Sequence, residues 1–132
     1  MKVLLACWPA VSELAIRSLG PDFEVSVAHT LERAQALLKQ QEFCLVVVTL
    51  RFNESSPLDL LPAAHAAGVP FAVVRFGLSR LSPEMVARSF RAAQACGCAL
   101  TMDLGAEVSV LGEEAALAAF RRMLKRTAMQ HR

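Results

Sequence analysis

Cys7 is the residue whose position most strongly suggests covalent chemistry. It directly follows an apolar run that begins at Lys2, and a helix is expected to start near Pro9. The positive end of a helix dipole lowers the pKa of a nearby thiol, and the thiolate is the nucleophilic form. The sequence therefore leaves open a small phosphocarrier or phosphatase-like enzyme that uses Cys7 at the end of strand one. The alternative is a buried structural thiol.

Arg51 and Arg75 are two cationic residues at the ends of apolar runs. Arg51 follows the run at 43–50, and Arg75 follows the run at 69–74. The carboxyl ends of parallel strands meet at one edge of a sheet, where ligands usually bind. Two guanidinium groups at that edge could together bind an anion such as a phosphate or an acidic loop, which makes a small-ligand binding domain a second alternative. The competing interpretation is that Arg75 pairs with a surface carboxylate.

The other cysteines and the histidines do not follow a metal-binding pattern. A single glycine separates Cys96 from Cys98, whereas zinc sites space paired cysteines by about two to four residues and need two further ligands. His29, His65 and His131 have no ligand spacing with them. We expect no metal site and no cofactor, and we expect His29 to face solvent in a loop after the second strand.

A sheet must position these side chains, and its expected centre is the run at residues 43–50. This run has three consecutive valines and no polar alternation, which is typical of a strand covered on both faces. Further strands are expected at 2–6 or 2–7, at 23–28 and at 69–74. The fifth strand is expected at 98–102, although residues 107–111 compete for that role.

Helices are expected between the strands, with clear start signals at two of them. Thr30 is the expected N-cap of a helix at 31–40, and Ser82 that of a helix at 82–96. The other helices are expected at 9–19, at 57–67 with a break or kink at Pro62, and at 113–128. Five strands alternating with five helices predict one α/β domain over residues 1–132, with a doubly wound five-stranded parallel sheet.

Composition narrows the classes of function. The chain has 132 residues, of which 55% are hydrophobic, and no uncharged apolar run approaches the roughly 18 residues that span a bilayer. A net charge of +2 gives no argument for nucleic acid or membrane binding, and the basic last helix has no aromatic platforms beside it. Four cysteines without disulfide spacing indicate free thiols and a cytoplasmic location.

The order and spacing of these elements resemble the receiver domain of bacterial two-component response regulators, which has flavodoxin-like topology. The run FCLVVVTLR from Phe43, followed by a loop at Pro57, resembles the third strand of that family. GVPFAVV from Gly68 resembles the approach to its fourth strand, and FEVSVA followed by LERAQALL resembles its second strand and helix. The resemblance covers nearly the whole chain and implies a signalling module that works by protein–protein contact.

The phosphorylation site of that family does not carry over. Its acidic pair at the end of strand one falls on Cys7 and Trp8, its phosphate-accepting aspartate falls on Thr49, and the hydroxyl residue ending strand four falls on Arg75, which Phe76 follows. The lysine that ends strand five has no counterpart, since no lysine occurs between positions 39 and 125. Mg²⁺ needs oxygen ligands, and phosphoryl transfer needs neutralised charge. We therefore expect a degenerate, phosphorylation-incompetent receiver in which these five residues form a vestigial pocket.

Two enzyme families look similar to this chain up to Cys7, namely the sugar phosphotransferase components and the low-molecular-weight tyrosine phosphatases. The phosphatase loop requires an arginine where this chain has Glu13, and the phosphotransferase loop is rich in glycine and serine, whereas Pro9 removes an N–H donor here. We accordingly expect a non-enzymatic module with an unidentified protein partner. The receiver resemblance implies residues 82–96 and 113–126 as its contact face, through which a homodimer is expected.

Overall fold

The run with three valines folds, as predicted, into the middle strand of a parallel sheet. β3 (Leu45–Thr49) is buried at every residue and lies between β1 (Lys2–Ala6) and β4 (Phe71–Arg75). β2 (Glu24–Ala28) and β5 (Leu100–Asp103) form the two edges, which gives the order β2-β1-β3-β4-β5. Every pairing is parallel, so the doubly wound, flavodoxin-like sheet predicted from the sequence is confirmed.

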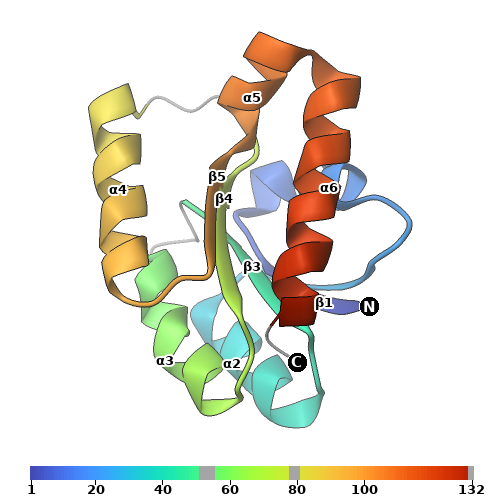
Figure 1. Ribbon diagram of the computed structural model, residues 1–132. Coiled ribbons are helices and arrows are strands. Elements are labelled where there is room, and N and C mark those ends of the chain that lie inside the picture. Colours follow the sequence, from blue (N-terminus) through green and yellow to red (C-terminus); the bar gives the residue numbers. More distant parts are fainter. Residues whose placement is uncertain (51–55, 78–80, 131–132) are drawn as a thin grey trace.

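The computed structural model describes residues 1–50, 56–77 and 81–130. Helices and two short 3-10 helices alternate with the strands along this part of the chain (Figure 1). Their bounds are η1 (Pro9–Val11), α1 (Ser12–Leu19), α2 (Leu31–Gln40), η2 (Pro57–Leu60), α3 (Leu61–Ala66), α4 (Pro83–Ala95), α5 (Leu104–Leu111) and α6 (Glu113–Gln130).

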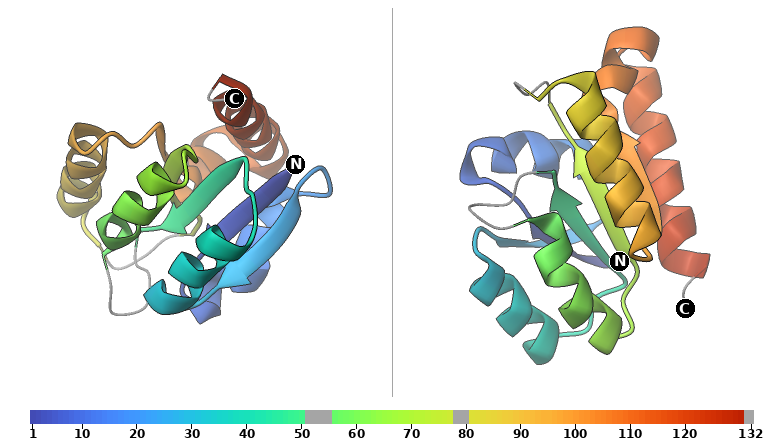
Figure 2. Two further views of the ribbon diagram at one scale, coloured as in Figure 1. Left: turned by 90° about the horizontal axis from the view of Figure 1, so that it is seen from below. Right: turned by 90° about the vertical axis from the view of Figure 1, so that its left-hand side faces the viewer.

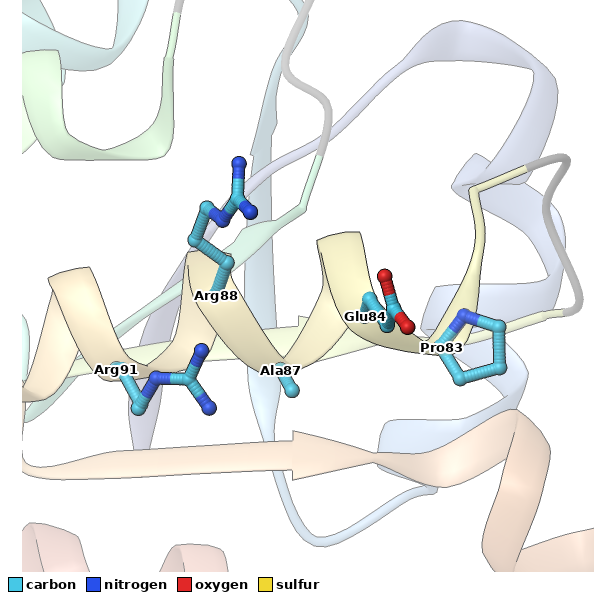
Figure 3. Close-up of a pocket in the computed structure, with 5 residues that line it drawn as sticks. All are labelled: Pro83, Glu84, Ala87, Arg88 and Arg91. Carbon is cyan, nitrogen blue, oxygen red and sulfur yellow. The ribbon is translucent and has the colours of Figure 1, made fainter.

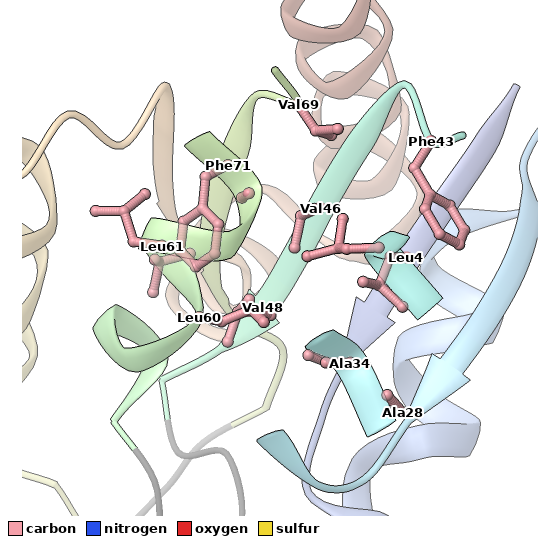
Figure 4. Packing of buried hydrophobic residues seen from close by; sticks show 14 of the residues in the cluster. Leu4, Ala28, Ala34, Phe43, Val46, Val48, Leu60, Leu61, Val69 and Phe71 are labelled. Carbon is pink, nitrogen blue, oxygen red and sulfur yellow. The ribbon is translucent and has the colours of Figure 1, made fainter. Parts of the chain in front are cut away.

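Helices cover both faces of the sheet (Figures 1 and 2). On one face, Val46 and Val48 of β3 pack in a buried cluster with residues of α2, α3 and α4 (Figure 4). On the other face, Val47 packs in a second cluster with residues of α1, α5 and α6, including Phe120. Fully burying one such side chain contributes about 1.5–3 kcal/mol, so the central strand anchors both halves of the core.

Polar side chains start the helices at the positions predicted for them. Thr30 Oγ1 accepts a hydrogen bond from the backbone N–H of Arg33 at 3.2 Å, which caps α2. Ser82 Oγ accepts one from the backbone N–H of Met85 at 3.2 Å, which caps α4. A cap of this kind is worth about 1 kcal/mol of stability, and it fixes where each helix leaves the edge of the sheet.

Pro62 lies in the first turn of a helix and does not interrupt one. Pro57 begins η2, whose N-cap Ser56 forms a reciprocal capping box with Asp59. Pro62 is the second residue of α3, where its missing N–H would have no helical partner in any case. The break expected within residues 57–67 is therefore a change from a 3-10 helix to an α-helix.

The C-terminal third contains a helix that the sequence analysis did not anticipate. The fifth strand is β5, which overlaps the expectation at 98–102, and residues 107–111 belong to α5. The N-cap of α5 is Asp103, whose Oδ1 accepts a hydrogen bond from the backbone N–H of Ala106 at 3.0 Å. Its C-cap is Gly112, whose φ of 87° favours glycine. Leu104 and Val108 lie one helical turn apart and both pack in the core beside α6. The apolar residues of this stretch that face the core therefore follow helical spacing.

Candidate functional site

The parallel strands bring the residues predicted for the site to one edge of the sheet. β1 leads into Cys7 and Trp8, β3 ends at Thr49, and β4 ends at Arg75 and is followed by Phe76. In open α/β sheets, ligands bind beyond the carboxyl ends of the strands. The chemistry available at this edge therefore depends on the direction in which each of these side chains points.

Alternation along the strands divides these side chains between the two faces of the sheet. Cys7 and Phe76 belong to the cluster beneath α1 and α6, and Thr49 points the same way as the alternate residues before it in β3. Arg75 points to the opposite face, as the alternate residues of β4 do. Trp8 leaves the sheet and is 42% exposed. The structure does not bring the five side chains together in one pocket.

Cys7 is a buried thiol. Its side chain is fully inaccessible, and its Sγ lies 3.4 Å from Ser12 Oγ near the start of α1. Burial raises the pKa of the Cys7 thiol, and the hydrogen bond with Ser12 opposes this rise only in part. The helix beginning after Cys7 was expected to lower the pKa, but the loss of hydration dominates because a thiolate is poorly solvated inside the core. This environment favours the neutral thiol.

Trp8 and His29 form the solvent-facing rim of this edge next to β1. His29 Nδ1 lies 3.1 Å from the backbone oxygen of Cys7, and the rest of His29 is exposed. The expectation that His29 is a solvent-facing loop residue is therefore confirmed. Trp8 is the only tryptophan in the sequence, so its fluorescence reports on this edge of the sheet alone.

Phe76 and Thr49 close the core at the strand ends. Phe76 is 5% exposed, and its ring packs edge-on against Phe120 of α6, with centroids 5.8 Å apart and an interplanar angle of 87°. This arrangement is favourable for aromatic pairs. Thr49 is also 5% exposed. At these two positions the edge is filled by packed side chains.

Arg75 forms an ion pair with Asp103, the last residue of β5. The two residues are register partners in neighbouring strands, and Arg75 Nη1 lies 2.8 Å from Asp103 Oδ2, with side chains 12% and 22% exposed. The sequence analysis expected Arg75 to pair with an unspecified carboxylate, and the structure identifies Asp103 as a carboxylate that does so. Receiver domains have a lysine at the end of strand five, whereas this chain has the negatively charged Asp103 at the end of β5.

Asp103 was missed as a site residue by the sequence analysis. It is one of three aspartates in the chain, and it directly follows the expected fifth strand, which was the available signal. Arg51, the other member of the anticipated anion-binding pair, lies outside the described residues. An anion approaching Arg75 would have to compete with the carboxylate that already contacts its guanidinium group.

The remaining thiols do not converge. Cys96 is exposed at the C-terminal end of α4, whereas Cys98 Sγ points inward and donates to the backbone oxygens of Leu100 at 2.9 Å and Phe71 at 3.1 Å. Burial raises the pKa of the Cys98 thiol. Within the described ranges, no three side chains of the histidine, cysteine, aspartate or glutamate type are grouped so that they could hold a metal ion.

Sequence comparison finds no match for this chain, whereas structural comparison finds solved structures of similar fold. No protein-family model matches it, and no curated protein sequence matches it. A CheY-like response regulator receiver domain from Methanospirillum hungatei superposes with a TM-score of 0.66 at 15% identity, over 98% of this chain and 97% of that one. The receiver domain of a Francisella response regulator gives a TM-score of 0.65 at 10% identity, over 99% and 98% of the two chains.

A third similar structure contains a bound magnesium ion. The receiver domain of a sensor histidine kinase from Pseudomonas aeruginosa, with a magnesium ion coordinated in its active-site cleft, gives a TM-score of 0.62 at 16% identity over 96% of both chains. At such identities the likeness concerns the fold, and this chain has a receiver-like α/β fold. In the part of the chain that the structure describes, no helix has both the length and the apolar character needed to cross a membrane.

Proposed function

We propose that this chain is a phosphorylation-incompetent receiver-like module that acts through protein–protein contact and is not an enzyme. The observation that carries the proposal is the set of groups at three strand ends, namely Thr49 on β3, Arg75 on β4 and Asp103 on β5. Threonine supplies no carboxylate to accept a phosphoryl group. The Asp103 carboxylate beside Arg75 adds negative charge where a transferred phosphoryl group needs positive charge.

The environment of Cys7 supports a non-enzymatic role. A nucleophilic thiol needs access to its substrate and a lowered pKa. Cys7 is buried, and its pKa is raised by that burial. In the proposed module Cys7 is a structural thiol, and residues 1–132 form one cytoplasmic domain that uses neither a metal nor a cofactor.

The proposed partner is an unidentified protein that binds the face formed by residues 82–96 and 113–126, and a homodimer through the same face is part of the proposal. Two methionines on this face, Met85 of α4 and Met123 of α6, are 51% and 37% exposed. Exposed methionines adapt their shape to a partner surface, which suits a protein–protein interaction face.

Phosphoryl-donor treatment tests the proposal. The protein is incubated with acetyl phosphate and Mg²⁺ and examined by intact mass, while a beryllofluoride complex with Mg²⁺ is titrated and followed by Trp8 fluorescence. We expect no mass adduct and no fluorescence change, with a phosphorylatable receiver domain treated in parallel as the positive control. A stable adduct would overturn the proposal. An adduct on Cys7 would establish the phosphocarrier alternative, and an adduct elsewhere would locate an acceptor other than the strand ends.

A further inference from the structure

The turn between α5 and α6 exposes two adjacent aliphatic side chains. Val110 is 81% exposed and Leu111 is 52% exposed, and both lie at the end of α5, beyond the carboxyl ends of the strands (Figure 1). The core contacts of α5 are made by Leu104 and Val108 instead. Packing of α5 onto the core therefore does not account for the aliphatic character of the exposed pair.

The residues on either side of this turn carry negative charge. Glu107 of α5 and Glu113 and Glu114 of α6 are all exposed, and the first basic residue along these two helices is Arg121. We call Glu107, Val110, Leu111, Glu113 and Glu114 the α5–α6 corner. Its aliphatic centre and acidic rim define the chemistry of a matching surface, which must be shallow, partly apolar and positively charged.

α4 carries a surface of that kind. A shallow hollow on this helix is lined by Pro83, Glu84, Ala87, Arg88 and Arg91, and these five residues are called the α4 hollow. Figure 3 shows that Arg88 and Arg91 extend from the helix on different sides, and that the small side chain of Ala87 lies nearer the Pro83 end of the helix than either arginine. No ion pair joins Arg88 or Arg91 to a carboxylate among the described residues.

We propose that the α5–α6 corner of one copy docks into the α4 hollow of a second copy, in a head-to-tail contact. The inference rests on the self-association part of the proposed function, but it replaces a two-fold homodimer through residues 82–96 and 113–126 by a heterologous contact that also uses residues 107–111. Val110 and Leu111 cover Ala87, while the glutamates of the corner pair with the arginines of the hollow. Glu84 repels those glutamates, so they approach from the Arg91 end of the hollow.

This contact has a consequence that a symmetric dimer does not have. Corner and hollow are different surfaces of one chain, so each docked copy still presents one unused corner or hollow. Such heterologous contacts continue into rings or open chains, whereas a two-fold contact stops at a dimer. Because opposite charges form its rim, association weakens as the salt concentration rises.

Two variants, each with one damaged surface, test the proposal by sedimentation velocity from micromolar to millimolar protein. The hollow variant is Arg88→Ala with Arg91→Ala, and the corner variant is Val110→Ser with Leu111→Ser. All four residues are exposed, and circular dichroism verifies that both variants fold. We expect the mass of the unmodified protein to grow past the dimer with concentration, and each variant alone to remain a monomer.

An equimolar mixture of the two variants gives the decisive result. It retains one intact corner and one intact hollow, so it should form a dimer that does not grow further. Ile16→Ser and Arg33→Ala, which change exposed residues on α1 and α2, serve as controls and should associate like the unmodified protein. The proposal is overturned if the unmodified protein stays monomeric, or if the mixture stays monomeric. It is also overturned if each variant still dimerises alone, which indicates a symmetric interface. None of these outcomes depends on whether the protein accepts a phosphoryl group.

Discussion

Arg75 and Asp103 are joined across β4 and β5 by a 2.8 Å contact between Nη1 and Oδ2, and the same carboxylate also starts a helix. Its second oxygen, Oδ1, accepts a hydrogen bond from the backbone N–H of Ala106 at 3.0 Å. One side chain therefore links the charge at the end of the sheet to the first turn of α5. The orientation of Arg75 and the position of α5 depend on the same residue.

Substitutions at Asp103 should separate these two contributions. Asparagine keeps an oxygen for the helix cap but loses the ion pair, whereas alanine loses both. An N-cap is worth about 1 kcal/mol, and a hydrogen bond to a charged group contributes about 1.5–3 kcal/mol. We expect Asp103→Ala to lower the free energy of unfolding in urea by more than Asp103→Asn does. Equal losses would show that the cap contributes nothing measurable.

Gly20 and Arg121 provide a second prediction, because a side chain at position 20 would displace Arg121. A Cβ there would lie 2.7 Å from Arg121 Nε, and Arg121 donates hydrogen bonds to the backbone oxygens of Ser18 and Arg17 at the end of α1. Gly112 has a similar φ, 87° against 81° for Gly20, but has nothing within 4 Å of its Cβ position.

Gly112→Ala thus measures backbone strain alone, about 1–3 kcal/mol. We expect Gly20→Ala to reduce the free energy of unfolding further than Gly112→Ala does. When Arg121→Ala is the common background, the difference between the two glycine variants should shrink. If it persists unchanged, the displacement of Arg121 is not its cause.

The four thiols should differ sharply in reactivity. Cys96 is exposed, whereas Cys7 is buried. We expect an aromatic disulfide reagent at neutral pH to modify Cys96 first and to reach Cys7 only after denaturation, as determined by peptide mass mapping. Cys96→Ala should abolish the fast phase. Rapid modification of Cys7 in the folded protein would instead support an enzymatic role for that thiol.

Stability should fall at alkaline pH because of two thiols, the buried Cys7 and the partly buried Cys98. Burial raises the pKa of Cys7 and of Cys98 above the ordinary value of 9.0. Above pH 9.0 the unfolded chain loses thiol protons that the folded chain retains, so the free energy of unfolding decreases as the pH rises; below that pH the contribution is constant. The sequence has no tyrosine, so no phenol titrates in the same range.

The measurement compares urea midpoints at neutral pH and near pH 10. A variant with Cys7→Ala and Cys98→Ala should lose less stability across this range than the unmodified protein does. An identical loss in both proteins would assign the alkaline effect to other groups.

Most of the fold could be predicted because its signals are local. The apolar run of β3, the capping side chains of Thr30 and Ser82, and the alternation of strands and helices each depend on neighbouring residues. α5 could not be separated from a strand in this way, since Val108, Val110 and Leu111 suit either structure. The hydrogen bond that caps it from Asp103 and its packing beside α6 decide the outcome, and both depend on the tertiary structure.

The site was predictable only in part, for a related reason. The sequence places Cys7, Thr49 and Arg75 at strand ends, and the structure confirms those positions. Which face each side chain takes depends on where its strand begins and ends. The pairing of Arg75 with Asp103 depends on the register between two strands whose paired residues are 28 positions apart, and no local pattern encodes that register.

The central position of β3 also determines how the protein should fail when it is heated. Residues 43–50 contain no charge and no proline, a pattern typical of segments that stack into cross-β aggregates. In the folded chain, β1 and β4 occupy both edges of this strand. Once heat separates those neighbours, copies of the strand from different molecules can pair with one another. We expect thermal denaturation to be irreversible, so that the half-life at a given temperature, rather than a melting point, measures resistance to heat.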